Sequence, residues 1–316
     1  MPRILFVKTS SLGDVLHNCP AVSDVARCVP GAQIDWLVEQ PFAGIAALHC
    51  AVRRVIPVAL RRWRRALWNP AVWSEMRALR RALAAEHYDT VIDTQGLLKS
   101  ALFCALASGE KHGMDRDSVR EPLAARGYDV CHAIARAQHA VERNRQLAGA
   151  ALGYAVPQDC DYGLRIERIA ARAAGGDYVV LLTMSSRGDK LWPEACWIEL
   201  GRALAERGLQ TLLPWGSASE RARCERLASR IAGAQVPQRM SLGELARTLR
   251  AARGVVGVDT GLSHLAAAAG VPVVGIFCAT DPALTGLYGS ARLRNLGTTG
   301  APPATARVLA ALEELL

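Results

Sequence analysis

Residues 3–38 read RILFVKTSSLGDVLHNCPAVSDVARCVPGAQIDWLV and decide the fold of the first half of the chain. The apolar runs RILFV and QIDWLV flank a segment with helical character from about Asp14 to Ala26. Short apolar runs separated by helices are typical of βαβ units and of a parallel sheet. The stretch also places Asp14 directly behind a glycine, in the first turn of the predicted helix, where the helix dipole stabilises a carboxylate. Asp14 can therefore cap the helix or take part in chemistry.

The same alternation continues along the chain and restarts once. In the first half, YDTVIDTQG precedes the helix-like LLKSALFCALA, and in the second half the strand-like runs are YVVLLTM, LQTLLPWG, RGVVGVDTG and VPVVGIF. A chain of 316 residues exceeds the usual size of one domain. We therefore predict an α/β fold of two similar parallel-sheet domains, with a linker near residues 155–176 and a final amphipathic helix in TARVLAALEEL.

Composition indicates a globular protein without a membrane span. Apolar residues make up 51% of the chain, and the longest uncharged stretch, HLAAAAGVPVVGIFCAT, is interrupted by Gly270 and Pro272. A spanning helix needs about 20 continuous apolar residues. The segment MPRILFVKTSS carries too short an apolar run for a secretory signal, so we expect a cytoplasmic location.

Cysteine and histidine spacing argues against disulfides and metal sites. The nine cysteines are scattered singly without a C-x-x-C pair, and the seven histidines show no H-x-x-x-H spacing. We interpret the cysteines as reduced core residues. The chain also lacks a D-x-D motif in a setting that would hold a cation against a diphosphate, so no metal and no other cofactor is expected.

Positive charge is concentrated in one part of the chain. The formal net charge is +9, and the region from Arg53 to Arg81 holds nine arginines against one carboxylate, Glu75. A patch of this kind favours an anionic partner, either an acidic substrate or an acidic lipid surface. Nucleic acid is disfavoured, because aromatic residues make up only 5% of the chain and no RNP-type or zinc-finger pattern occurs.

Within this region, residues 60–68 read LRRWRRALW and place Leu60, Trp63 and Leu67 at helical spacing. One side of such a helix can pack on the protein while its arginines face an anion. The arginines can bind an acidic substrate, contact the headgroup layer of a membrane or form a solvated face.

Three loops that follow predicted strands carry polar residues suited to a binding site: TSSLGD, TMSSRGDKLWP and DTGLSH. Ligands of open parallel sheets bind outside the carboxyl ends of the strands. Because the loops come from both halves of the chain, we predict a site in a cleft between the two domains.

The loop DTGLSH, residues 259–264, combines small residues with a helix N-terminus. Helix N-termini bind anions through their free amides, and a diphosphate would fit there. Alternatively, Asp259 or Thr260 only caps the helix.

The loop TMSSRGDKLWP suits the same ligand. The hydroxyls of Ser185 and Ser186 and the ammonium of Lys190 can contact phosphate oxygens, although a lysine in a loop can equally be solvated. After the next predicted strand, LPWGSASE ends in Glu220, which can accept hydrogen bonds from ribose hydroxyls or be an ordinary acid at a helix start.

Eight segments in order carry a resemblance to a known family: VKTSSLGDVLHNCPAVSD, VIPVALRRWRRALW, YDTVIDTQGLLKSAL, KHGMDRDSVREPLA, QHAVERNRQLAG, DKLWPEACW, LPWGSASE and VDTGLSHLAAA. They resemble the lipopolysaccharide heptosyltransferases of type I, the inverting glycosyltransferases of Gram-negative bacteria that add the first heptose to Kdo-modified lipid A. The resemblance runs from residue 3 to about residue 290. Single short motifs such as DTG are weak, but this many in order are specific.

The resemblance implies a GT-B fold, in which two Rossmann-like domains face each other across a cleft. Residues 1–160 would form the acceptor-binding domain and residues 176–300 the domain that binds the nucleotide sugar, with the final helix, 303–316, packed back on the first domain. The implied donor is ADP-L-glycero-β-D-manno-heptose and the implied acceptor is Kdo-lipid A. Peripheral contact with the anionic cytoplasmic face of the inner membrane follows from a lipid acceptor.

The resemblance also implies roles for single residues. Asp14 would be the catalytic base that takes the proton of the attacking Kdo hydroxyl, and Lys190 would neutralise charge on the leaving diphosphate. Familiar relatives carry threonines where this chain has the diphosphate-binding Ser185 and Ser186. Donor binding is further implied for the ribose ligand Glu220, for Met240 at the adenine, and for the loop residues Asp259, Thr260, Gly261 and His264. The anions of the acceptor would meet Arg61, Arg62, Arg64, Arg65 and Arg120.

Other interpretations stay open. A type II heptosyltransferase shares fold and donor but adds to a heptose, although TSSLGD and RRWRR favour type I. A nucleotide-sugar epimerase would turn over the donor without an acceptor. A non-catalytic nucleotide-binding or membrane-associated module would bind ADP and would not need Asp14. Met240 and His264 can also be structural core residues.

Overall fold

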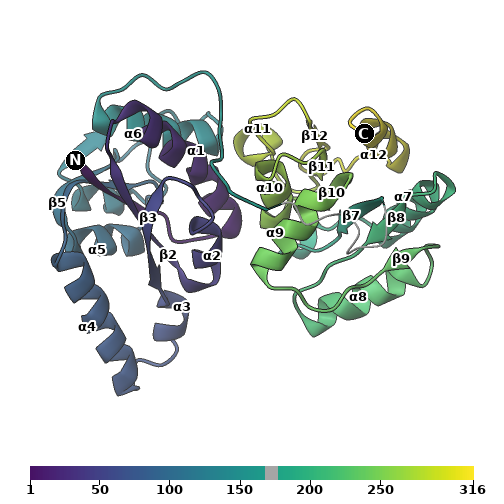
Figure 1. The fold of residues 1–316 in the computed structure, drawn as a ribbon, viewed down its shortest axis with the longest axis horizontal. Coiled ribbons are helices and arrows are strands. Elements are labelled where there is room, and N and C mark those ends of the chain that lie inside the picture. The colour runs from purple at the N-terminus through teal and green to yellow at the C-terminus, as the bar shows by residue number, and fades with distance from the viewer. Residues whose placement is uncertain (168–176) are drawn as a thin grey trace. The chain divides into compact units, whose positions relative to one another are not determined.

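A parallel sheet of six strands forms the centre of each of two units, Met1–Arg165 and Ile166–Leu316. The computed structural model describes residues 1–167 and 177–316 (Figure 1). The last nine residues of the predicted linker, 168–176, therefore lie outside the described residues.

The sheet of the first unit has the strand order β3-β2-β1-β4-β5-β6, with all neighbours parallel. Its central strand β1 is buried on both faces from Ile4 to Val7, as expected of a strand covered by helices on both sides. The strand order reverses between β1 and β4, and such a switch point is where parallel sheets bind ligands. The strands are β1 (Arg3–Val7), β2 (Gln33–Glu39), β3 (Val52–Val58), β4 (His87–Asp93), β5 (Ser108–Met114) and β6 (Val130–His132).

Helices cover both faces of this sheet (Figure 1). Helices α1 (Leu12–Cys28) and α6 (Ala140–Leu152) pack together on one face. Helices α4 (Pro70–Ala84) and α5 (Leu98–Leu106) supply apolar side chains to a core on the other face, together with Leu5 and Val7 of β1. The shorter elements are η1 (Gln40–Phe42), α2 (Ala43–Ala46), α3 (Leu60–Trp63) and η2 (Pro122–Gly127).

The second unit repeats this topology. Its order, β12-β11-β10-β7-β8-β9, is the order of the first sheet when each set of strands is numbered from its own start, and the switch point lies between β7 and β10. The predicted internal repeat of two α/β halves is therefore confirmed. The strands are β7 (Tyr178–Leu182), β8 (Gln210–Leu212), β9 (Ala234–Gln235), β10 (Gly254–Val258), β11 (Val273–Ile276) and β12 (Leu293–Leu296).

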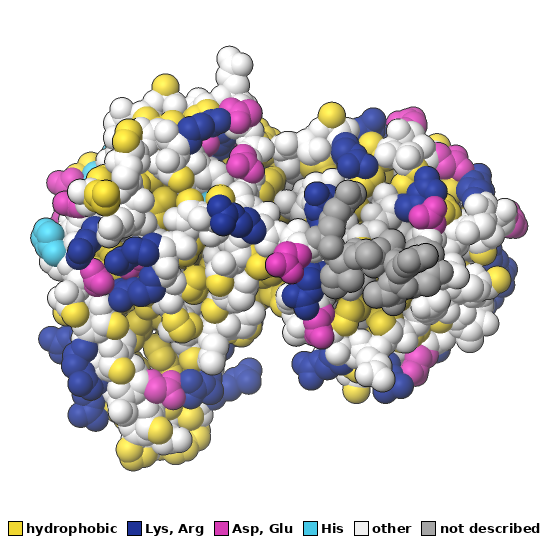
Figure 2. All heavy atoms as spheres, in the orientation of Figure 1, with side chains coloured by type: hydrophobic (Ala, Val, Ile, Leu, Met, Phe, Trp, Pro, Cys, Tyr) yellow, Lys and Arg dark blue, Asp and Glu magenta, His cyan; other side chains and the backbone are white. Residues whose placement is uncertain are grey.

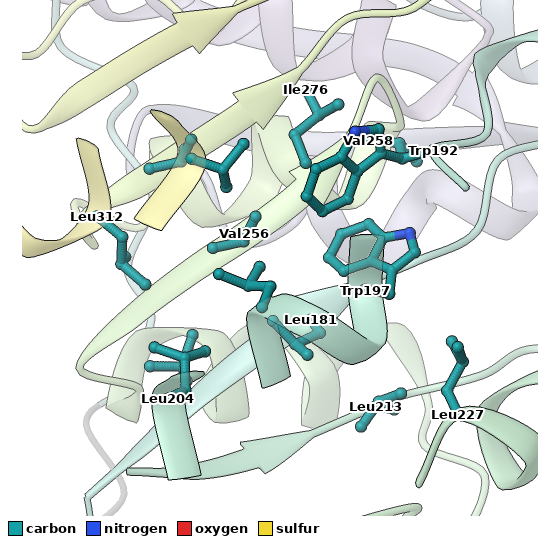
Figure 3. Packing of buried hydrophobic residues seen from close by; sticks show 14 of the residues in the cluster. Leu181, Trp192, Trp197, Leu204, Leu213, Leu227, Val256, Val258, Ile276 and Leu312 are labelled. Atoms are coloured by element: carbon teal, nitrogen blue, oxygen red, sulfur yellow. The ribbon is translucent and has the colours of Figure 1, made fainter. Parts of the chain in front are cut away.

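The core of the second unit is built around two tryptophans (Figure 3). Trp192 and Trp197 are fully buried and meet edge to face, with ring centroids 5.1 Å apart. Figure 3 shows the two rings side by side, with Val258 and Ile276 of the sheet next to Trp192. The helices are η4 (Gly188–Lys190), α7 (Glu194–Glu206), α8 (Ala218–Ala228), α9 (Leu242–Ala251), α10 (Gly261–Ala268), α11 (Pro282–Thr285) and α12 (Thr305–Glu313).

The final helix, α12, packs against α7 and β11 of the second unit. The expectation that residues 303–316 also pack back on the first domain stays a prediction. Val308 and Leu312 have no accessible surface, and both belong to the core of the second unit. Burial of this apolar stripe explains why the helix stays with the sheet nearest to it in the chain.

The arginine-rich segment is also less helical than predicted. Only Leu60–Trp63 forms a helix, α3, and Leu67 keeps 47% of its surface exposed instead of packing. The chain then restarts as α4, where Pro70 occupies the first turn and the side chain of Asn69 accepts a hydrogen bond from the amide of Ala71. The residue before a proline favours extended backbone, and Asn69 has extended backbone directly before α4 begins.

The cysteines are free in the described residues, but not all of them lie in the core. Cys50 and Cys131 are exposed, so their interpretation as core residues is wrong. Cys131 lies in β6, a short strand at the edge of the sheet, where a side chain can face solvent. Within residues 1–167 and 177–316, no helix combines the length and the apolar character that a membrane crossing requires.

Candidate functional site

The two loops of the second unit that are predicted to bind phosphate follow adjacent strands, β7 and β10, at the switch point. Strands β7 and β10 pair with Leu182 opposite Gly257, so the loop after β7 meets the loop after β10. The hydroxyl of Ser185 donates a 3.2 Å hydrogen bond to the main-chain carbonyl of Asp259. The structure therefore brings TMSSRGDKLWP and DTGLSH together, as the pattern of strands predicts.

Asp259 is the centre of a polar cluster. Its carboxylate accepts hydrogen bonds from the ammonium of Lys190 and the hydroxyl of Thr280, both at 2.6 Å, and its other oxygen lies 3.8 Å from Nε2 of His264. Burial alone would raise the pKa of Asp259, but the interactions with His264, Lys190 and Thr280 outweigh burial and hold the pKa well below its usual range. Asp259 is therefore ionised and holds the lysine in place.

The geometry argues against the alternative that the side chain of Asp259 or Thr260 caps α10. Thr260 occupies the N-cap position with extended backbone, but its side chain makes no cap hydrogen bond. The carboxylate of Asp259 is engaged by Lys190 and Thr280 instead. Since Gly261 begins the helix, no side chain at that position covers the first amides of α10, an arrangement suited to an anion.

A cavity of about 270 Å³ opens beside these loops. Five of the residues predicted to bind the donor line it, and they come from loops that are far apart in the sequence. Apolar lining is supplied by residues such as Leu242 and Leu245 of α9, which gives one end of the cavity the character of a nucleobase pocket. The five predicted residues are Ser185, Ser186, Glu220, Met240 and Thr260.

Glu220 has a structural role as well as its place in the cavity. Its Oε2 accepts hydrogen bonds from the amides of Gly216 and Ser217, at 2.7 and 3.3 Å, and Ser217 Oγ accepts from the Glu220 amide. These contacts form a capping box at the start of α8. A binding role for Glu220 would therefore use the carboxylate in an orientation that the cap has already fixed.

The site also has polar and aromatic residues that were not predicted from the sequence, among them Trp215, Arg239 and Thr280. Trp215 and Arg239 line the cavity. The indole nitrogen of Trp215 donates a 2.7 Å hydrogen bond to Pro237, and the Arg221 guanidinium lies 5.4 Å above the ring. Thr280, which bonds Asp259, follows strand β11. The sequence could have indicated Trp215, because it lies in the stretch LPWG that follows a predicted strand. No sequence motif around Thr280 indicates a role in the site.

In the first unit, Asp14 lies in the first turn of α1, as predicted. Its Oδ2 accepts hydrogen bonds from the amide of Ser11 at 2.6 Å and from the hydroxyl of Ser11 at 3.1 Å. Asp14 therefore caps the helix, and both hydrogen bonds within the described part of the chain fall on the same oxygen. The cap uses Oδ2 of Asp14, and Oδ1 stays available for a role in the reaction.

The predicted arginines divide into two groups. Those of residues 60–68 are exposed around α3, where Arg62 forms an ion pair with Glu75 at 2.6 Å. Arg120 lies elsewhere in the first unit, and its charge acts on Lys8 in the Asp14 loop. Figure 2 shows further dark-blue side chains along α4, which carries Arg77, Arg80 and Arg81.

Lys8 is a buried cation that sequence analysis did not single out. Its ammonium donates a 2.6 Å hydrogen bond to the carbonyl of Thr94. Burial lowers the pKa of Lys8, the nearby carboxylates of Asp14 and Asp93 oppose this shift, and the charges of Arg143 and Arg120 add to it. Basic side chains of Lys8, Arg143 and Arg120 and the carboxylates of Asp14 and Asp93 therefore lie within electrostatic reach of one another at this loop.

No group of three or more histidine, cysteine, aspartate or glutamate side chains is arranged to hold a metal ion in the described ranges. Positive charge near the cavity of the second unit is instead supplied by Lys190 and by the N-terminus of α10.

Comparison with known sequences identifies the family. The model of glycosyltransferase family 9 (heptosyltransferase) matches residues 76–308. The chain is 50% identical over 293 residues to lipopolysaccharide heptosyltransferase 1 of Pseudomonas aeruginosa, which covers 92% of this chain and 82% of that protein. It is 49% identical to lipopolysaccharide heptosyltransferase 1 of Escherichia coli K12, with 91% of each chain covered.

Solved structures agree with this assignment. The structure described as E. coli heptosyltransferase WaaC with ADP superimposes with a TM-score of 0.91 at 45% identity, covering 99% of this chain and all of that one. The same enzyme with ADP-2-deoxy-2-fluoro heptose gives a TM-score of 0.89 at 44% identity, with the same coverage. E. coli ADP-heptose lps heptosyltransferase II shares the fold, with a TM-score of 0.80 at 20% identity. The predicted GT-B class of two Rossmann-like parallel sheets is confirmed, and the chain belongs to glycosyltransferase family 9, the heptosyltransferases.

Proposed function

We propose that this glycosyltransferase moves L-glycero-D-manno-heptose from ADP-L-glycero-β-D-manno-heptose to the Kdo of Kdo-lipid A, with inversion at the anomeric carbon. The observation that carries the proposal is the cavity of the second unit, whose serine, glutamate, methionine and threonine lining belongs to a chain 44% identical to an enzyme solved with ADP-2-deoxy-2-fluoro heptose. The reaction would contribute the first heptose of the lipopolysaccharide inner core.

The donor would bind through residues of the second unit. Ser185, Ser186 and the α10 N-terminus would hold the diphosphate, and Glu220 the ribose. Lys190 would neutralise the negative charge that grows on ADP as it leaves. Met240 would contact the adenine, while the sugar hydroxyls and phosphates would meet Asp259, Thr260, Gly261 and His264.

Asp14 would act as the general base. Its carboxylate would take the proton of the attacking Kdo hydroxyl, and the hydroxyl oxygen would form a bond to the anomeric carbon of the heptose. The bond between that carbon and the β-phosphate oxygen would break, and ADP would leave with the electron pair. The hydrogen bonds from Ser11 support this role, because they fix the orientation of the carboxylate while using only Oδ2.

The acceptor would bind through arginines of the first unit. Kdo carries a carboxylate and lipid A carries phosphates, and guanidinium groups bind both with paired hydrogen bonds. The arginines concerned are Arg61, Arg62, Arg64, Arg65 and Arg120. Arg61, Arg64 and Arg65 are the stronger candidates on the α3 segment, since Arg62 already pairs with Glu75.

We further propose that the enzyme works at the cytoplasmic face of the inner membrane and touches its anionic surface through residues 60–68. Trp68, with 82% of its surface exposed, lies beside exposed arginines in this segment. Trp73 is 48% exposed and its indole nitrogen donates a 2.7 Å hydrogen bond to the carbonyl of Leu67. Aromatic side chains next to basic ones suit the headgroup region of a bilayer.

A type II activity, with a heptosylated core as acceptor, is the alternative. The relatives at 49 to 50% identity are named as type 1 enzymes, whereas the type II structure is 20% identical and shows the fold alone. Purified enzyme offered both acceptors would separate the two. Transfer only to the heptosylated acceptor would overturn the proposal.

The main test is ADP release by wild type and Asp14→Asn, with ADP-heptose, in the presence and absence of de-acylated Kdo-lipid A. Asparagine caps helices well, so the variant should fold and bind ADP as wild type does. We expect release to depend on the acceptor and to fall about 10² to 10⁴-fold in the variant, the range for loss of a positioned base. Release of ADP without acceptor would indicate hydrolysis of the donor, turnover of the donor without release of ADP would indicate an epimerase, and full activity of the variant would reduce Asp14 to a helix cap.

A further inference from the structure

One glutamine side chain holds the loop that leads to Asp14. Oε1 of Gln95 accepts hydrogen bonds from two successive amides, those of Thr9 at 3.0 Å and Ser10 at 3.1 Å. Gln95 is 7% exposed, so this oxygen serves the loop and not solvent. Around it, the ammonium of Lys99 donates a 3.1 Å hydrogen bond to the hydroxyl of Ser10.

The contact exists because the two loops leave neighbouring strands. Strands β1 and β4 pair with Val7 opposite Asp93, so the residues that follow them run side by side at the switch point. In the second unit, the loop after the corresponding strand lines the cavity. In the first unit, the two amides that could form an anion-binding nest at this point are occupied by a side chain of the protein.

Gln95 is itself fixed from behind. Its own amide donates a 2.8 Å hydrogen bond to Oδ1 of Asp93, and the amide of Gly96 donates to the same oxygen at 3.1 Å. The hydroxyl of Tyr128 donates to the other oxygen of Asp93 at 2.8 Å. Asp93 is fully buried, so these bonds anchor the main chain at Gln95.

A continuous path links this anchor to the proposed base. Ser10, whose amide is held by Gln95, is followed by Ser11, whose amide and hydroxyl hold Oδ2 of Asp14. We propose that Gln95 is a positioning residue for heptose transfer, which fixes the Thr9–Ser11 loop and through it the place of the Asp14 carboxylate. This inference rests on the proposed function, because it needs Asp14 to act in the reaction.

The test compares three substitutions at one position. Gln95→Met keeps the length of the side chain and removes the acceptor oxygen, and we expect kcat to fall about 10²-fold, the effect of a displacement of about 1 Å in a catalytic group. The KM for ADP-heptose and the affinity for ADP should not change, because the donor residues lie in the second unit. Gln95→Glu restores an acceptor oxygen and should recover most of the lost kcat. If Gln95→Met does not fold, Gln95→Asn replaces it, because its shorter side chain withdraws the oxygen from both amides.

The controls separate positioning from general damage. Gln146→Met changes a half-buried glutamine on α6 in the same unit and should leave kcat unchanged. Wild-type kcat in Gln95→Met, or no recovery in Gln95→Glu, would overturn the positioning role. Failure of the proposed function would be seen independently, because Asp14→Asn would then stay active whatever the substitutions at Gln95 do.

Discussion

The ammonium of Lys190 donates a 2.6 Å hydrogen bond to Oδ2 of Asp259, and only 18% of the lysine side chain and 8% of the aspartate side chain are exposed. The pair joins the loop after β7 to the loop after β10. Because the carboxylate is ionised, the lysine is held as a cation at the place where a diphosphate would be bound. The cation is thus positioned before any ligand arrives, which avoids a reorganisation cost during the reaction.

We predict that Lys190→Met lowers kcat about 10² to 10³-fold, the cost of removing a group that stabilises charge only as it develops. Lys190→Arg should recover part of the activity, because a guanidinium keeps the charge but not the compact shape. Steady-state kinetics with ADP-heptose will separate this role from simple binding. An unchanged kcat with a raised KM would mean that Lys190 holds the donor in the ground state only.

The free energy of unfolding should depend on pH through the protonation of His49. Burial lowers the pKa of His49 from 6.5 to about 4, partly opposed by a hydrogen bond to the Cys19 carbonyl and by the charge of Asp161. Nδ1 accepts from the amide of Ala51, so Nε2 carries the proton and donates to Cys19. The folded protein therefore keeps this histidine neutral where the unfolded chain would bind a proton.

The sign follows from this difference. The contribution of His49 to the free energy of unfolding is fully present above pH 6.5. It is lost as the pH falls from 6.5 toward 4, which lowers the free energy of unfolding by about 3 kcal/mol at most. Urea unfolding of wild type and His49→Gln across this range measures it, since glutamine can donate to the same carbonyl without titrating. Parallel stability curves for the two proteins would contradict the prediction.

A buried ion pair and an exposed one offer a matched comparison. Arg145 on α6 and Asp24 on α1 are each 2% exposed and lie 2.7 Å apart, and the same guanidinium also donates to the carbonyls of Pro157 and Asp159. Arg27 pairs with Asp159 near by, with 46% and 69% of the side chains exposed.

We expect Arg145→Met to reduce the free energy of unfolding by about 3–5 kcal/mol, because the buried carboxylate of Asp24 loses its hydrogen-bonded partner and keeps only Arg27, 3.7 Å away. Arg27→Met should cost about 1 kcal/mol or less, because its pair with Asp159 is exposed and its contact with Asp24 is longer. Denaturant unfolding of both variants gives the comparison. Equal losses would mean that the burial of Asp24 does not decide the energetics.

Much of the fold could be predicted, because short apolar runs in the sequence indicate where the buried strands lie. The run RILFV became β1 and GVVGV became β10, and both are fully buried apart from the first residue of β1. The repeat of βαβ units predicted a parallel sheet in each half but not the order of its strands, which only the structure gives. The position of α12 could not be predicted in this way, because the side chains of Val308 and Leu312 can fill any apolar surface of the right shape, and only the assembled sheet selects one.

The candidate site shows the same division. The loops that carry Asp14, Ser185 and Asp259 were visible as polar stretches after apolar runs. Their partners were not: Gln95 lies 86 residues from Thr9 along the chain, and Thr280 lies 21 residues from Asp259. Such contacts depend on which strands become neighbours, so they appear only once the sheet order is known.

The segment around α3 provides the prediction about the membrane. Arg61, Arg64 and Arg65 are exposed, and Trp68 projects beside them with most of its surface free. A basic residue near an anionic surface contributes about 1 kcal/mol, and this contribution falls with salt, whereas insertion of an aromatic side chain does not. The two kinds of contact can therefore be separated by salt concentration.

We expect the enzyme to sediment with vesicles that contain phosphatidylglycerol and not with phosphatidylcholine alone. Reversal of the three arginines to glutamate should weaken binding at low salt by more than about 10²-fold, the sum expected from three charges. Trp68→Ser should reduce the part of binding that survives high salt. The control reverses three exposed arginines of the second unit, Arg221 and Arg226 on α8 and Arg230 just after it. Equal losses from both reversals would show that net charge alone attracts the protein to the vesicle, and unaltered binding after reversal at α3 would exclude this segment as the contact.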